Sequence, residues 1–321
     1  MTHRKRLGQE DRPWVHVVLV AACFFVCFPM LFAIIKATQT REGVITPSLA
    51  LGGHLIDNIR TVWTQYDLGM YMRNSFFISL WVTAGKIVLS LLAATAIVFY
   101  DFRGKKVVFG LIIVTLMFPT EILILGLFQL VSNKGAPTLA ALLQWMFNPK
   151  EFFLAPTKYG FGWGDTKLGV IFPFLASATG VFLFRQQFLT IPRSLVDSAR
   201  MDGANSLQFL ARILVPMSLN TIGALTVIQF VYVWDQYIWP RVVIRQNANQ
   251  VIQVGLNSII SAGDSIMWNH VMAGAVLAMV PPAAGLRTAL QRLHERLRTL
   301  LKQVEKEKHN RIIHCARLCP S

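Results

Sequence analysis

The sequence predicts an all-α, polytopic membrane protein with six transmembrane helices. Hydrophobic residues make up 54% of the chain and charged residues 15%, with a mean hydropathy of +0.49, whereas a soluble domain carries about a quarter charged residues. Six apolar stretches reach or approach the roughly 20 residues that cross a bilayer as a helix. None of them alternates polar and apolar residues as the strands of a membrane barrel do. The expected spans are Trp14–Ala37, Ser75–Phe99, Val107–Val131, Leu168–Phe188, Ile213–Trp239 and Trp268–Leu286.

Each of the first three spans has one informative feature. The first is too long for a signal peptide and lacks a small-residue cleavage site, so we expect a retained helix. The second holds Lys86 well inside apolar sequence. The third contains Pro119, which frees a carbonyl group and bends a helix, and then Glu121. Such polar groups are costly in lipid, so we expect them to face a cavity or a neighbouring helix.

The last three spans are set apart by what flanks them. The segment 133–166 before the fourth contains an amphipathic stretch, 140–147, that would form a lid or docking element, or rest on lipid. The fifth ends in the aromatic stretch Trp234–Pro240, for which an interfacial belt is favoured over a ligand cage. After the sixth, the sequence of residues 287–321 is strongly basic. This segment is either a cytoplasmic tail or the product of an altered coding-region end.

The formal net charge of +15 is distributed unevenly between the loops. Lysine and arginine gather in residues 1–13, 103–106, 193–212 and 287–321. Positive loops remain in the cytoplasm, so both termini and the 193–216 loop are expected there. A basic face against anionic lipid is favoured over nucleic-acid binding. The cysteines match no zinc-ligand spacing, so we expect no metal site.

The 193–216 loop is too structured for a simple tether. Ser194 is expected to cap a first helix, with Asp197 as its capping-box partner. Gly203 is expected to end that helix in the left-handed conformation. Asn205 or Ser206 then starts a second helix with apolar residues on one face. A soluble helical hairpin between two membrane spans indicates a docking element.

Several motifs carry a resemblance to a known family. Asp197, Ser198 and Ala199, followed by Gly203 and by Pro216 at the entry to the next span, resemble the EAA motif of ATP-binding-cassette (ABC) importer permeases. The family usually has Glu and Ala where this chain has Asp197 and Ser198. The string 199–204 is similar to that of carbohydrate permeases of the maltose-permease class. Further similarity to the second permease subunits of sn-glycerol-3-phosphate importers lies at residues 72–75, 85–86, 118–121, 176–178, 182–186, 234–240 and 281–282.

The resemblance implies a type I ABC importer permease fold in a bacterial plasma (inner) membrane, with a core at residues 70–286 and the first span, 14–37, outside it. It also implies three kinds of partner: a sister permease in a heterodimer, two copies of a cytoplasmic ABC ATPase, and an extracytoplasmic substrate-binding protein. The substrate would be sn-glycerol 3-phosphate or a glycerophosphodiester, with a sugar or oligosaccharide as the alternative. An ion-coupled secondary transporter, which would show inverted repeats, is the alternative of a different class.

The chain itself is expected to catalyse no reaction and to hold no cofactor. It has no G-x-x-x-x-G-K-[ST] phosphate loop, so ATP would be bound by the partner subunits. Lys86 would meet an anionic group of the substrate, or else pair with Glu121 or with a carboxylate of the sister subunit. The residues expected to contact the ATPase are Asp197, Ser198, Ala199, Arg200, Asp202, Gly203 and Pro216. The candidate substrate-pathway residues are Asn74, Lys86, Glu121, Asp235 and Gln236.

Overall fold

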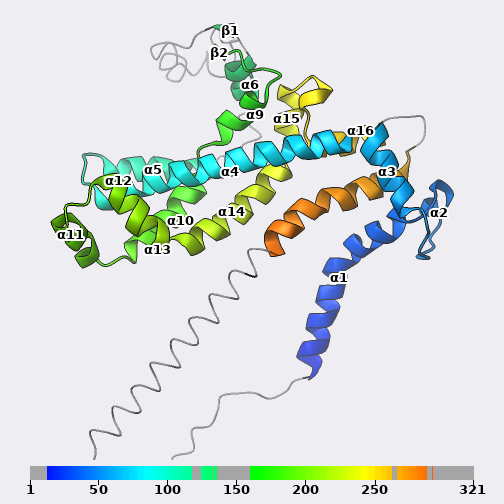
Figure 1. Ribbon diagram of the computed structural model, residues 1–321, viewed down its shortest axis with the longest axis horizontal. Helices are drawn as coiled ribbons and strands as arrows, with labels where there is room; N and C mark the ends of the chain where they lie inside the picture. Colours follow the sequence, from blue (N-terminus) through cyan, green and yellow to red (C-terminus); the bar gives the residue numbers. More distant parts are fainter. Residues whose placement is uncertain are drawn as a thin grey trace, which may run out of the picture. The chain divides into compact units, whose positions relative to one another are not determined.

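The computed structural model describes residues 13–117, 124–132, 134–135, 160–261, 266–287 and 291, and these are almost entirely helical (Figure 1). The chain divides into two compact units. One runs up to Leu68 and resumes at Leu256–Met279, and the other comprises Gly69–Gly255 and continues from Val280. Glu121, the stretch 140–147 and almost all of the 287–321 tail lie outside the described residues.

The first unit contains α1 (Pro13–Ala37), α2 (Arg41–Ile45), α3 (Leu55–Gln65) and most of a last helix, Trp268–Arg287. The end of α1 holds the segment that follows it in place. The buried Lys36 ammonium donates hydrogen bonds to Gln39 Oε1 and to the carbonyl oxygens of Thr46 (2.7 Å) and Ser48 (3.0 Å). These bonds fix the loop between α1 and α3 through backbone groups.

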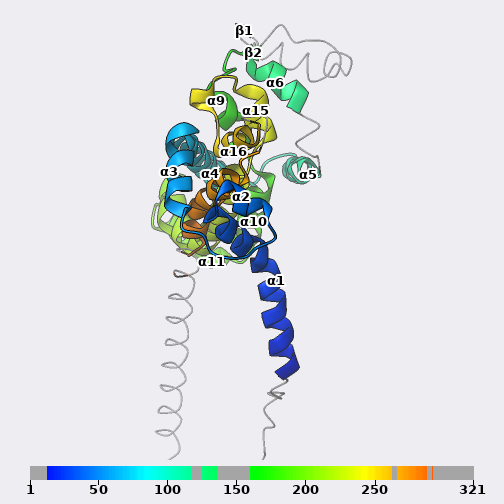
Figure 2. The ribbon, with the colours of Figure 1, turned by 90° about the vertical axis from the view of Figure 1, so that its right-hand side faces the viewer.

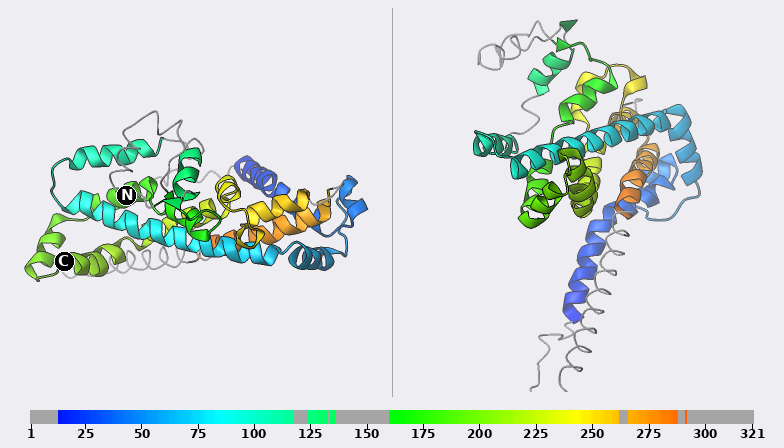
Figure 3. Two further views of the ribbon diagram at one scale, coloured as in Figure 1. Left: turned by 90° about the horizontal axis from the view of Figure 1, so that it is seen from above. Right: turned by 60° about the vertical axis from the view of Figure 1, so that its left-hand side comes forward.

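The second unit is arranged around α4 (Leu68–Phe99), a helix of 32 residues. Figure 3 shows it as one unbroken helix. It also contains the α-helices α5 (Lys105–Thr115), α6 (Ile124–Ser132), α9 (Lys167–Ile171), α10 (Ala178–Leu189), α11 (Arg193–Met201), α12 (Ser206–Phe209), α13 (Val215–Met217), α14 (Leu219–Trp234) and α15 (Ile238–Val243), and α16 (Ile252–Ile260) begins in it. The remaining elements are three short helical turns, η1 (Phe172–Phe174), η2 (Leu210–Leu214) and η3 (Asn247–Asn249), and the antiparallel pair β1 (Lys134–Gly135) and β2 (Gly160–Phe161). Figure 2 looks along α4.

The all-α membrane fold predicted from the sequence is confirmed, but two of the expected spans are bent pairs of helices. Among the residues that the structure describes, three helices are continuous and apolar enough to cross a membrane: 14–37, 68–99 and 268–287. The fourth and fifth expected spans are not single straight helices. Each is a pair of helices, bent by 40° after η1 and by 77° at Ser218. The third expected span coincides with α5 and α6, between which 118–123 is not described.

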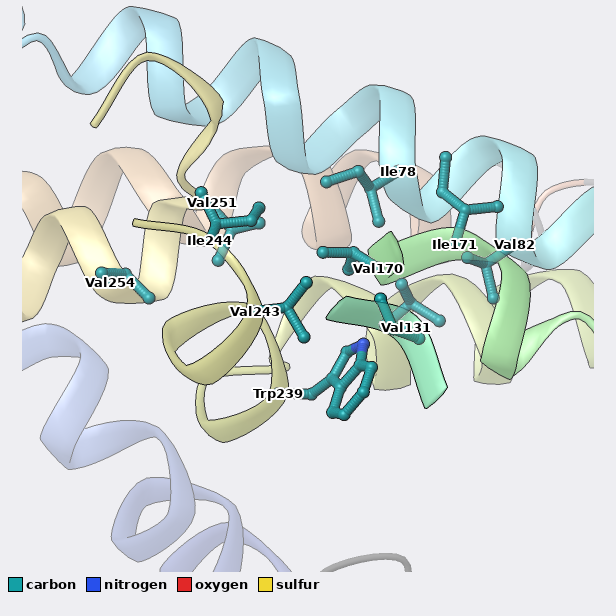
Figure 4. Packing of buried hydrophobic residues seen from close by; sticks show 11 residues of the cluster. Ile78, Val82, Val131, Val170, Ile171, Trp239, Val243, Ile244, Val251 and Val254 are labelled. Carbon is teal, nitrogen blue, oxygen red and sulfur yellow. The ribbon is translucent and has the colours of Figure 1, made fainter. Parts of the chain in front are cut away.

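Two groups of buried apolar side chains hold the second unit together. The first group joins α4, α6, α9 and α15 and centres on Trp239, Val243 and Val170 (Figure 4). The second joins the other end of α4 to α10, α11 and α12, and we call it the loop cluster. Its fully or almost fully buried members are Leu91, Ala94, Phe184, Phe188, Ile191, Val196, Ala199, Phe209, Leu214 and Leu225.

The burial of two tryptophans corrects the expectation for the aromatic stretch 234–240. Trp234 is 1% exposed and Trp239 is 2% exposed, so neither tryptophan belongs to an interfacial belt. Trp234 stacks on Phe230, and the ring of Trp239 packs edge-on against Phe174. The chain turns back into its own core after α14, which buries these rings.

Candidate functional site

The 193–216 loop begins with α11, whose first residue follows Pro192. Pro192 is the N-cap, with φ −61° and ψ 136°, and it offers no side-chain cap. The predicted Ser194 cap with Asp197 as its partner is therefore wrong, because Ser194 already lies inside the first turn. Its carbonyl oxygen accepts a hydrogen bond from Ser198 Oγ at 2.9 Å. Proline suits this position because its missing N–H would have no partner at a helix start.

The end of α11 is as predicted. Gly203 has φ +73°, in the left-handed region where side chains are strained. The Gly203 N–H donates to the Arg200 carbonyl oxygen and the Ala204 N–H to that of Ala199, both at 3.0 Å. These two bonds form a Schellman motif, with Asp202 as the C-cap. The motif fixes the direction in which the chain leaves α11.

The start of α12 settles the choice between Asn205 and Ser206 in favour of Asn205. Asn205 Oδ1 accepts from the Gln208 N–H at 2.8 Å, and Gln208 Oε1 accepts from the Asn205 N–H at 3.0 Å. This reciprocal pair is a capping box. Both ends of the turn between α11 and α12 are thus hydrogen-bonded, and these bonds restrain the hairpin.

The passage from α12 into α14 is helical but irregular. Residues 210–214 form a π turn, followed by α13, which contains Pro216. The proline has no N–H to donate, and a wider turn before it accommodates the missing bond. The helix then breaks at Ser218, where the direction changes by 77°. Pro216 therefore lies at a fixed bend between the loop and the membrane-spanning α14.

The loop has a buried side and an exposed side. Val196, Ala199 and Phe209 are buried in the loop cluster. On the other side Met201 is 88% exposed and Leu207 is 70% exposed, and they flank Gly203. The charged or polar candidates Asp197, Ser198, Arg200 and Asp202 are all exposed. The candidate contact residues are thus exposed, except for Ala199, which is buried.

The loop is also attached to the end of α4. The ring of Phe99 packs edge-on against Phe209, with ring centres 5.3 Å apart. Tyr100, directly after α4, shares a 2.5 Å hydrogen bond between its hydroxyl group and Ser206 Oγ. A displacement of α12 therefore acts on α4 as well as on α14.

Lys86 lies in the middle of α4 and is 5% exposed. Its ammonium group donates to Gln229 Oε1 on α14 at 2.7 Å and lies 4.8 Å from the ring centre of Tyr232. The alternative partner Glu121 is outside the described residues. The structure thus gives Lys86 two neutral neighbours from α14.

Two of the other pathway candidates, Asn74 and Asp235, are held by tertiary hydrogen bonds. Asn74 Nδ2 donates to the carbonyl oxygens of Ala248 (2.8 Å) and Gln250 (3.0 Å). Asp235 Oδ1 accepts from Gln253 Nε2 at 3.2 Å. Gln236 lines a small pocket that is otherwise mainly apolar. Asn74, Lys86 and Asp235 are not among the residues that line this pocket.

Some residues near Lys86 were not singled out from the sequence. Tyr232 and the buried hydroxyl groups of Ser79 and Thr83 belong here. The signal that indicates the hydroxyls is the spacing of polar residues at three and four positions along α4, which places them on one helix face. Within the described segments, no group of three or more His, Cys, Asp or Glu side chains could hold a metal ion.

Several helices long and apolar enough to cross a membrane, together with a helical loop capped at its central turn, are the features of a polytopic membrane protein among the described residues. The chain belongs to the family of binding-protein-dependent transport system inner membrane components, whose sequence profile matches residues 86–299. It is thus a multi-pass permease subunit of a binding-protein-dependent importer.

Named relatives and solved structures agree with this family. The chain is 34% identical to the sn-glycerol-3-phosphate transport system permease protein UgpE of Brucella melitensis, over 83% of this chain and 89% of that protein. It is 32% identical to UgpE of Escherichia coli K12, over 85% of this chain and 92% of the relative.

The fold is similar to that in a crystal structure of a bacterial ABC transporter involved in the import of the acidic polysaccharide alginate. The TM-score is 0.67 at 19% identity, covering 88% of this chain and 98% of the other. A second structure of the alginate transporter, in complex with an alginate pentasaccharide-bound periplasmic protein, gives a TM-score of 0.58 at 16% identity, covering 87% and 93%.

Proposed function

We propose that this permease imports sn-glycerol 3-phosphate or a related glycerophosphodiester, as one half of a heterodimer with a sister permease. The substrate follows from the relatives, which carry this activity in their names and align along most of the chain. An extracytoplasmic binding protein delivers the substrate. Two copies of a cytoplasmic ATPase bind and hydrolyse ATP, and this chain holds no cofactor of its own.

The 193–216 loop is the contact with one ATPase subunit. The observation that supports this role is the combination of a Schellman motif and a capping box around an exposed pair of apolar side chains, Met201 and Leu207. A rigid element transmits a displacement, whereas a flexible tether absorbs it. The exposed Asp197, Arg200 and Asp202 add charges of both signs for a polar groove. This role places the loop and both chain termini in the cytoplasm.

Transport by the intact system tests the substrate. The permease gene is deleted and restored in its host, and uptake of radiolabelled sn-glycerol 3-phosphate is measured, with maltose and glycerol as competitors. We expect uptake to depend on the gene and to be unaffected by either competitor. Uptake that depends on the gene but is specific for an oligosaccharide would overturn the substrate and leave the importer class intact.

A further inference from the structure

One face of α4 carries a row of buried polar side chains. Its members are Ser75, Ser79, Thr83, Lys86 and Ser90, and all five are at most 5% exposed. Their spacing of four, four, three and four residues places them on one side of the helix. We call this row the polar α4 face. It lies within the second unit and extends over four helical turns.

The two ends of this face have hydrogen-bond partners within the chain. Ser75 Oγ accepts from the Ile252 N–H at 2.7 Å, and Ser90 Oγ donates to the Ser177 carbonyl oxygen at 3.2 Å. Both bonds hold α4 to another element.

The two hydroxyl groups in the middle, on Ser79 and Thr83, have no hydrogen-bond partner in the described part of the chain. A helical Ser or Thr ordinarily donates to the carbonyl oxygen four residues earlier, as Thr95 does to Leu91 at 2.7 Å. A buried hydroxyl group without a partner lowers the stability of the fold by about 1–3 kcal/mol. Two such groups on one face indicate donors that find their acceptor only in another state.

The Lys86 ammonium group extends this set of donors. It has three N–H bonds, and among the described residues only Gln229 accepts one of them. Within that same part of the chain, no carboxylate lies within ion-pair distance of Lys86. A buried cation is strongly destabilising without an anionic partner, and an intramembrane one is typical of a substrate path.

We infer that Ser79, Thr83 and Lys86 are successive contacts for the phosphoryl group of the substrate during translocation. The inference rests on the proposed function and names the group that this face recognises. The oxygens of an ionised phosphate accept hydrogen bonds, and all three side chains offer donors. Ser79 and Lys86 are about 10 Å apart along the helix, so they form stations along a path.

The face is closed in this conformation, and α14 covers it at Lys86 through Gln229 and Tyr232. The same α14 continues from the 193–216 loop through the bend at Ser218. A displacement of the loop that moves α14 away from α4 exposes the donors to the substrate. ATPase closure would thereby open a phosphate path.

The test separates a role in recognition from a role in folding. Thr83→Val and Ser79→Ala are made in the intact transporter, with Thr95→Val as the matched control, because the Thr95 hydroxyl group already has an internal partner. Uptake of sn-glycerol 3-phosphate gives the KM, and thermal unfolding of the purified complex gives the Tm. We expect Thr83→Val and Ser79→Ala each to raise the KM about fivefold, the value of one hydrogen bond, with the Tm unchanged or higher. Thr95→Val is expected to leave the KM unchanged.

Lys86 is tested with Lys86→Arg and Lys86→Met. We expect Arg to keep measurable uptake and Met to abolish it, at equal amounts of assembled complex. The inference would be overturned by an unchanged KM for both hydroxyl variants, or by a rise in KM matched by a fall in Tm. In either case wild-type uptake still supports the proposed function. Failure of the wild-type transporter to take up sn-glycerol 3-phosphate would overturn the proposed function itself, and the phosphoryl assignment with it.

Discussion

Replacing Gly203 by valine tests whether the 193–216 loop couples ATP hydrolysis to transport. Gly203 has φ +73°, and a Cβ built there meets no atom within 4 Å. The Cβ atom of the new side chain therefore has room, and the expected cost is backbone strain of about 1–2 kcal/mol. A protein stable by about 5–15 kcal/mol tolerates this and still folds.

The strain is relieved by opening the Schellman motif, because the two 3.0 Å bonds from Gly203 and Ala204 require the left-handed turn. The direction of α12 relative to α11 then changes, while the membrane-spanning helices remain as they are. We expect uptake by proteoliposomes to fall about tenfold or more, the factor that 1.4 kcal/mol represents. The stimulation of ATP hydrolysis by the loaded binding protein is expected to be lost.

Gly104→Val is the matched control. Gly104 has φ +84° and equally open space at its Cβ position, and it caps α5 outside the 193–216 loop. The strain is the same, so the control variant is expected to retain coupled transport. Wild-type uptake and stimulated hydrolysis in Gly203→Val would refute the reasoning, and so would equal losses in both variants.

Three further substitutions test neighbouring features. Asn205→Ala removes the capping box and should destabilise α12 by about 1 kcal/mol, which lowers stimulated ATP hydrolysis. Asn205→Asp should retain the capping box and the stimulated hydrolysis. Identical hydrolysis rates in the two variants would contradict this role of the cap. Met201→Ser should leave the Tm of the complex unchanged, because the side chain is 88% exposed. The same substitution should weaken ATPase binding in a pull-down titration. Unchanged binding argues against the docking surface. Gly180→Ala places a Cβ 2.3 Å from Ser90 Oγ. The substitution should lower the Tm, at a cost of about 1–3 kcal/mol, and the double variant Gly180→Ala/Ser90→Ala should recover part of the loss. A Tm equal to that of the wild type would show that α4 and α10 do not pack closely here.

The parts of the structure that the sequence predicted correctly depend on local rules. Gly203 and Asn205 act through bonds to residues within a few positions along the chain, so their roles are readable from the sequence. The Ser194 cap was wrong because Pro192 already starts the helix two residues earlier. Ser and Pro both favour helix starts, and the sequence alone did not rank them.

The parts that were missed depend on tertiary packing. An apolar run has the same composition whether its helix is straight or bent, so the break at Ser218 was not visible. Trp234 and Trp239 are as compatible with a membrane interface as with a core, and only the return of the chain after α14 buries them. The contact between Lys86 and Gln229 joins residues 143 positions apart. The roles of the candidate coupling and pathway residues remain predictions.

The continuity of α4 has a mechanical consequence. Tyr100, directly after this helix, is bonded to the 193–216 loop. Asn74 and Ser75, about two turns inside its other end, are bonded to residues 248–252. Its 32 residues make a rod about 48 Å long, and a tilt of about 5° at one end moves the other by about 4 Å. The helix therefore acts as a lever arm. A small angular movement at the end next to the 193–216 loop thus becomes a displacement of atomic size at the other end of α4.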